Sequence, residues 1–125
     1  MKRIIQTDNA PKAIGPYSQA VEANGFLFIS GQLGIDPKTG KLGSGVEEQA
    51  RNSMQNLGHI LRAAGIDYRN IVRTGIFLKD MSDFQTVNAV YATFFQESFP
   101  ARATIAVGGL PMDAAVEIEA VALLG

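Results

Sequence analysis

The sequence predicts an α+β fold in which one β-sheet carries two helices packed on one face. Two segments have apolar residues at helical spacing, and the other apolar segments are short and either alternating or rich in β-branched residues, as strands are. The expected order is three strands, a helix, a strand, a second helix and two final strands. The chain has 125 residues and no linker or low-complexity stretch, so we expect a single domain over residues 1–125.

The N-terminal third of the chain is expected to be extended, with strands over residues 17–21 and 26–30. Asn24-Gly25 lies between these two segments, and this dipeptide favours the tight turn of a hairpin. A glycine-rich loop is expected over residues 31–45. It contains DPKTG at residues 36–40, a sequence that is typical of a tight turn.

The first helix is expected to begin at Ser44 and to end before Gly65. Ser44 and Glu47 have the spacing of a capping box, and glycine commonly terminates a helix. His59 lies off the apolar stripe of this helix, so we expect it to be a solvated helix residue. The stripe itself comprises Val46, Ala50, Met54, Leu57, Leu61 and Ala64.

Ser82 and Gln85 repeat the capping pattern, which predicts a second helix that runs to about Phe95. A strand is expected before this helix, over residues 71–79, and two strands follow it, over residues 102–107 and 115–123. The apolar stripe of the second helix comprises Phe84, Val87, Tyr91, Phe94 and Phe95.

The composition argues against several classes of protein. Eleven Lys and Arg residues are scattered among 12 acidic residues, for a net charge of −1, which disfavours a nucleic-acid partner. The chain has no cysteine and a single histidine, His59, which excludes a disulfide framework, a thiolate nucleophile and a multi-histidine metal centre. Neither a signal-peptide core nor an apolar run of the roughly 18 residues that a membrane helix needs is found. We therefore expect a cytoplasmic protein that binds neither a metal nor a membrane.

Arg102 opens a strand that is otherwise uncharged, and strand alternation places it on the same face as Thr104. One interpretation is an arginine that reaches water from the end of a strand. The other is a guanidinium that binds a carboxylate, because its planar pair of N–H donors matches two oxygens. Such a charged pair is worth about 1.5–3 kcal/mol.

Glu117 and Glu119 share one face of the last strand, and this face continues into the apolar Val121 and Leu123. A solvated face is one interpretation. Acidic residues beside apolar ones also fit a face that a partner subunit covers, where a carboxylate could orient a water molecule. If the two strands were neighbours, a glutamate could instead pair with Arg102.

Three further candidates carry weaker signals. Asn88 interrupts the apolar stripe of the second helix, where its amide needs hydrogen-bond partners that could be either structural groups or a ligand. Tyr17 follows a rigid Gly-Pro entry to a strand. Ser30-Gly31 ends another predicted strand, at a point where glycine would let a ligand approach backbone N–H groups.

Together these residues resemble the RidA (YjgF-type) family of enamine/imine deaminases over essentially the full length of the chain. The segments that carry the resemblance are AIGPYSQ at residues 13–19, SGQ at 30–32, DPKTG at 36–40, VN at 87–88, FPAR at 99–102, LP at 110–111 and EIEA at 117–120. The chain departs from the family at Thr104, where many members have cysteine, and its loop before Phe99 is short.

The resemblance implies a chorismate-mutase-like fold, assembled as a homotrimer with active clefts between subunits. Arg102 would hold the substrate carboxylate, Glu117 would position the attacking water, and Tyr17 would complete the catalytic set. The remaining residues that the resemblance places in the substrate-binding cleft are Ser30, Gly31, Asn88 and Thr104.

The activity that the resemblance implies is hydrolysis of reactive 2-imino acids and their enamines to 2-keto acids and ammonia, without a cofactor. The substrates would be 2-aminoacrylate, 2-iminopropanoate and 2-iminobutanoate. An iminium carbon is already electrophilic, so we expect orientation and fixed dipoles to provide most of the acceleration. Two alternatives stay open: a non-catalytic module that binds a small carboxylate, and an RNA-cleaving translation inhibitor.

Overall fold

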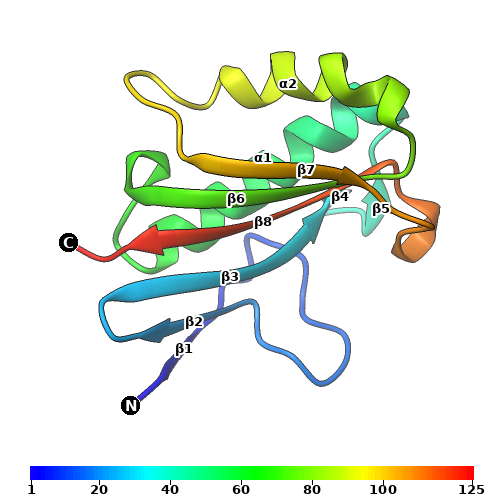
Figure 1. Cartoon of the computed structure of the whole chain (residues 1–125). Coiled ribbons are helices and arrows are strands. Elements are labelled where there is room, and N and C mark those ends of the chain that lie inside the picture. The colour runs from blue at the N-terminus through cyan, green and yellow to red at the C-terminus, as the bar shows by residue number, and fades with distance from the viewer.

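The computed structural model covers residues 1–125 and contains a mixed six-stranded sheet with both helices on one side (Figure 1). The helices are α1 (Gly45–Ala63) and α2 (Phe84–Ala92). In the order of the sheet, the strands are β1 (Arg3–Ile5), β2 (Ala20–Ala23), β3 (Phe26–Leu33), β8 (Val116–Leu123), β6 (Ile71–Leu78) and β7 (Ala101–Ala106). This arrangement confirms the predicted α+β fold.

Strand pairing in the sheet is antiparallel except between β6 and β7, which are parallel. Parallel neighbours need a crossover connection, and α2 provides it. The last strand, β8, inserts between β3 and β6, and β7 forms one edge of the sheet because it pairs only with β6 (Figure 1). Three short 3₁₀ turns complete the chain, at Tyr68–Asn70, Met81–Asp83 and Pro111–Asp113.

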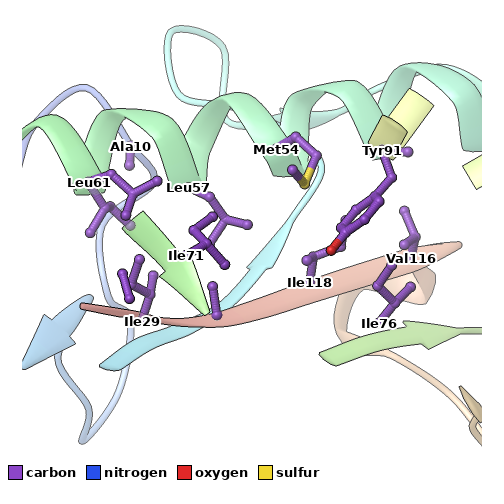
Figure 2. Packing of buried hydrophobic residues seen from close by; sticks show 14 of the residues in the cluster. Ala10, Ile29, Met54, Leu57, Leu61, Ile71, Ile76, Tyr91, Val116 and Ile118 are labelled. Carbon is purple, nitrogen blue, oxygen red and sulfur yellow. The ribbon is translucent and has the colours of Figure 1, made fainter. Parts of the chain in front are cut away.

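The hydrophobic core lies between the helices and the sheet. Met54, Leu57 and Leu61 of α1 are fully buried, and Figure 2 shows them pointing toward Ile118 and its neighbours on the strands. Tyr91 of α2 points down to the same sheet face (Figure 2), where its hydroxyl lies 2.7 Å from Oγ1 of the buried Thr74. The predicted apolar stripe of α1 is therefore its core-facing side.

The opposite face of the sheet is not covered by helices (Figure 1). In β8 the residues alternate, so that Val116, Ile118 and Ala120 are buried whereas Glu117 and Glu119 are only partly so, as predicted. Phe28 is 48% exposed and Ile105 is 50% exposed on this open face, beside the two glutamates. Apolar and acidic side chains thus share one uncovered surface.

The N-terminal half differs from the sequence prediction in two places. Tyr17 precedes its strand, which begins at Ala20, because Gly15 adopts a φ of +123° and turns the chain. The expected loop after Gly31 is shorter, since β3 continues to Leu33 and a second, two-stranded sheet follows, formed by β4 (Ile35–Asp36) and β5 (Lys41–Leu42). The hairpin turn at Asn24-Gly25 and the turn at residues 36–40 are confirmed.

The helix ends also differ in detail. The side chain of Ser44 makes no cap, and its backbone N–H instead donates to Glu48 over 2.6 Å, so the predicted partner Glu47 is wrong. Gly65, with a φ of +79°, follows α1 as expected. The predicted cap of the second helix is wrong as well, because α2 starts after the 3₁₀ turn and ends at Ala92 rather than Phe95. No helix in the chain combines the length and the apolar character that a membrane span requires.

Candidate active site

Arg102 lies on the helix-facing side of the edge strand β7. It pairs in register with the buried Thr74 of β6, whose hydroxyl meets α2. Nη1 of Arg102 donates a hydrogen bond to Oδ1 of Asn88 over 2.8 Å. The guanidinium carbon also lies 5.1 Å from the ring centroid of Tyr91 and 5.7 Å from that of Phe84.

These contacts hold the guanidinium in one orientation. A cation beside an aromatic ring gains about 0.5–1 kcal/mol at an exposed site, and Arg102 meets two rings. Of its five N–H donors, Asn88 takes one. The side chain is exposed, so the remaining donors are free to bind an anion.

A hollow of about 310 Å³ lies directly beside this arginine. We call it the arginine half-site; it is lined by Asn88, Tyr91, Ala92, Phe99, Pro100 and Arg102. Its walls are mostly apolar and aromatic, with one charged group at the edge. Such a hollow suits a small molecule that has a carboxylate at one end and an aliphatic chain at the other.

Thr104 stands two residues after Arg102 on the same face of β7, opposite Ile76. Its hydroxyl oxygen is buried and has no hydrogen-bond partner in the chain. An unpaired buried hydroxyl costs about 1–3 kcal/mol, so a ligand or water that reached it would recover a hydrogen bond. The structure thus places a polar group close to the arginine half-site.

The other predicted site residues gather around a second hollow, of about 640 Å³, on the open face. We call it the carboxylate half-site; its walls include Tyr17, Ser30, Gly31, Glu117 and Glu119. The hydroxyl of Ser30 donates to the carbonyl of Ser18 over 2.6 Å. Ser30 therefore anchors the segment that carries Tyr17, whose side chain is 53% exposed at the rim.

Gly31 and Glu117 fit together closely. A Cβ atom at position 31 would lie 2.8 Å from Cδ of Glu117, a distance that real Cβ contacts do not tolerate. The strand pairing is irregular between Ile29 and Gln32, which places Gly31 in a β-bulge. Glycine at this position thus makes room for the carboxylate to lie against the backbone of β3.

Burial raises the pKa of the Glu117 carboxyl, and the negative charge of Glu119 raises that pKa further. Glu119 in turn forms an ion pair with Arg73, with Oε2 3.6 Å from Nη1. A carboxylate with a raised pKa is a stronger base than an ordinary surface carboxylate. This property suits a group that activates water.

The two half-sites lie on opposite faces of the same sheet. Arg102 shares its face with Thr74 and the helices, whereas Glu117 lies beside Phe77 on the open face. Strand β6 also separates the two strands that carry them. The predicted option of a direct pair between a glutamate and Arg102 is therefore wrong, and within one chain the predicted residues form two groups rather than one.

The model of the family described as Endoribonuclease L-PSP matches residues 7–124. The chain belongs to this family, which includes RidA and YjgF. The resemblance seen in the sequence is thereby confirmed.

Relatives within the RidA family are similar over their whole length. The mouse 2-iminobutanoate/2-iminopropanoate deaminase is 52% identical over 126 residues, which span 100% of this chain and 93% of that protein. RidA from the Antarctic bacterium Psychrobacter sp. is 42% identical with a TM-score of 0.95, over 98% of this chain and 99% of that one. The crystal structure of E. coli TdcF with bound serine is 41% identical with a TM-score of 0.95, over 98% and 99% of the two chains.

Sequence reasoning about this RidA-family chain does not single out three of the residues that shape the half-sites. Phe84 and Tyr91 fit a core stripe and are read as packing residues, yet their rings also hold Arg102. Phe99 follows the short loop and becomes a wall of the arginine half-site. The spacing of Phe84, Asn88 and Tyr91 along one helix face is the sequence signal that could have grouped them.

Proposed function

We propose that the chain is a hydrolase that deaminates short 2-imino acids, as a 2-iminobutanoate/2-iminopropanoate deaminase. The observation that carries the proposal is Arg102, which Asn88 and two aromatic rings hold at the edge of an apolar hollow of about 310 Å³. Relatives with that name, about 50% identical in sequence over the full length of the chain, support the proposal. The structure of TdcF with bound serine also supports it, because serine has a carboxylate like the proposed substrates.

The complete cleft, in this proposal, forms between two copies of the chain. One copy provides Arg102, Asn88 and Thr104, and the neighbouring copy provides Glu117, Tyr17 and the Ser30-Gly31 segment. The separation of the half-sites on opposite sheet faces supports this arrangement, because no single chain can join them. The exposed Phe28 and Ile105 of the open face are apolar surface that a neighbouring copy would cover.

We further propose a chorismate-mutase-like homotrimer with three such clefts. A cleft built from two different surfaces is a heterologous contact, and such contacts form a ring when the rotation between copies closes. In a closed ring of three copies, every arginine half-site meets one carboxylate half-site. A cytoplasmic location stays a prediction of the sequence.

Substrate binding would start at the carboxylate. The free N–H donors of Arg102 would bind the two oxygens in a bidentate pair worth about 1.5–3 kcal/mol. The short aliphatic side chain would lie against Tyr91 and Phe99, and the Thr104 hydroxyl would hydrogen-bond with the bound substrate or its water. These contacts would hold the substrate so that its C2 atom faces the neighbouring copy.

Glu117 would then act on the water. As a carboxylate it accepts a proton while the water oxygen forms a bond to C2 of the iminium, and the resulting glutamic acid returns the proton to the amine nitrogen. The C–N bond then breaks while Glu117 takes the carbinol proton and passes it to the departing ammonia, so that the iminium acid plus water gives the 2-keto acid plus ammonium. Positioned acid–base groups of this kind typically contribute about 10²–10⁴-fold.

Hydrolysis of imino acids suits the two hollows better than RNA cleavage, although the family description names an endoribonuclease. An RNA site needs several basic side chains to neutralise phosphates. The two hollows hold one basic residue each, Arg102 and Lys12, and the second hollow adds two glutamates.

The test is formation of 2-keto acid from a freshly generated enamine, compared between the wild type and Arg102→Ala. We expect the variant to lose at least about a hundredfold in kcat/KM while its circular dichroism is unchanged. Arg69→Ala is the matched control, because that arginine is exposed, pairs only with Asp67 and lies in neither half-site. Near wild-type turnover in Arg102→Ala would contradict the proposal, and binding of a keto acid without any wild-type turnover would make the chain a carboxylate-binding module.

A further inference from the structure

A third hollow, of about 420 Å³, lies between the middle of α1 and the turn that joins β4 to β5. It shares a single residue, Ile35, with the carboxylate half-site and none with the arginine half-site. Ile35 is also its only hydrophobic wall residue among ten. The proposed deaminase chemistry makes no use of this hollow.

Helix α1 provides one side of the hollow with Asn52, Gln55, Asn56 and His59. The spacing of three and four residues places these four side chains on one helix face, away from the core stripe. A polar helix face is ordinarily solvated, but Asn56 is only 1% exposed. His59 is also partly buried rather than fully solvated as the sequence predicted.

Asn56 presents an acceptor that the protein does not use. Its amide nitrogen donates to the carbonyl oxygens of Leu33 and Ile35 over 3.3 and 2.9 Å, which fixes the orientation of the amide. Oδ1 accepts no hydrogen bond from the chain, and the residue lines the hollow. Asn52 is similar, because its nitrogen donates to the carbonyl of Gly34 over 3.2 Å.

The walls are acidic overall and rich in oxygen acceptors. Besides the amides of Asn52 and Asn56 they hold the carboxylates of Asp8 and Asp36, and Oδ1 of Asp36 already accepts from the backbone N–H of Lys38 over 2.8 Å. The amides of Asn9 and Gln55 complete the polar walls, and each offers both donors and an acceptor.

On the donor side, Nη2 of Arg62 lies 3.2 Å from Nδ1 of His59, so Nδ1 acts as the acceptor and Nε2 carries the proton. Burial lowers the pKa of His59, and the charge of Arg62 lowers it further, so both effects favour the neutral ring. Lys38 is the one cationic wall residue.

The chemistry of a fitting ligand follows from these groups. Two carboxylates against one lysine disfavour a phosphate, and the walls have no Phe, Tyr or Trp on which a base or sugar ring could stack. An ammonium group satisfies oxygen acceptors with three N–H donors, and a carboxylate on the same ligand suits Lys38 and His59. We propose that this hollow binds a free amino acid, with its ammonium group at Asp8 and Asn56 and its carboxylate at Lys38 and His59.

The test is a titration of the ¹⁵N-labelled full chain with L-serine, read at the side-chain amide resonances of Asn56 and Gln55. We expect a saturable shift of both signals in the wild type and in Arg102→Ala, because the arginine half-site is not involved. Ethanolamine, which lacks the carboxylate, and glycerate, which lacks the ammonium group, should both bind more weakly than serine.

Asp8→Asn is the decisive variant, since Asp8 is exposed and the substitution keeps its shape. Loss of its charge should weaken serine binding by roughly tenfold, whereas Glu97→Gln, an exposed acid outside the hollow, should leave the affinity unchanged. The proposal fails if serine produces no saturable shift, if Asp8→Asn binds as well as the wild type, or if Arg102→Ala abolishes the shift. None of these results depends on whether the chain deaminates imino acids.

Discussion

Mixing two inactive variants provides the sharpest test of the cleft between copies. Arg102→Ala removes the arginine half-site and Glu117→Gln disables the carboxylate half-site, so each variant alone should lose about a hundredfold or more in turnover. The two residues stand on opposite faces of one sheet. If each cleft takes Arg102 from one copy and Glu117 from its neighbour, a mixed assembly can restore an intact cleft.

The size of the recovery follows from random assembly. In an equal mixture, about half of the copies keep Arg102 and about half of their neighbours keep Glu117, so about one quarter of the clefts are intact. The two variants would be unfolded together, refolded together and assayed for 2-keto acid release per copy. Each variant refolded alone is the control, because it should stay inactive.

The outcome that would refute the two-copy cleft is a mixture no more active than its components. In that case both residues would have to act within one chain, which the sheet does not allow, and Glu117 would lose its catalytic role. The number of copies is measured separately by sedimentation equilibrium. One chain has a mass of 13.4 kDa, so three copies should give about 40 kDa.

Three other predictions concern single residues. Glu119→Gln removes one of the two causes that raise the pKa of Glu117. Because the proposed mechanism uses Glu117 as a carboxylate, the acidic limb of the pH–rate profile should move to lower pH, and an unmoved limb would exclude this electrostatic role. Thr104→Val replaces an unpaired buried hydroxyl with a methyl group of similar size. Urea unfolding of the variant should show equal or higher stability, whereas its kcat/KM should fall. An unchanged kcat/KM would make Thr104 a packing residue. Leu57→Ala, at a fully buried position of α1, should lower the free energy of unfolding by about 2–5 kcal/mol, and a urea midpoint within error of the wild type would contradict the assigned core.

Much of the fold is predictable because the relevant signals are local. The apolar stripe of α1, the alternation of β8 and the Asn24-Gly25 turn follow from spacings of two to four residues. The helix caps were less predictable. Several polar side chains near the start of a helix can accept hydrogen bonds from the same backbone N–H groups. At Ser44 the backbone N–H donates to Glu48 rather than to Glu47.

The sequence by itself determined the α+β class, the family and the main polar residues of the arginine and carboxylate half-sites, since these depend on residue type and short-range pattern. Only the tertiary structure decided that β8 inserts between β3 and β6. That order separates Arg102 from Glu117, and the connection from α2 to β7 brings Phe99 to the arginine half-site. Strand order is set by contacts between segments that lie far apart in the chain, so no local spacing reveals which two faces will meet.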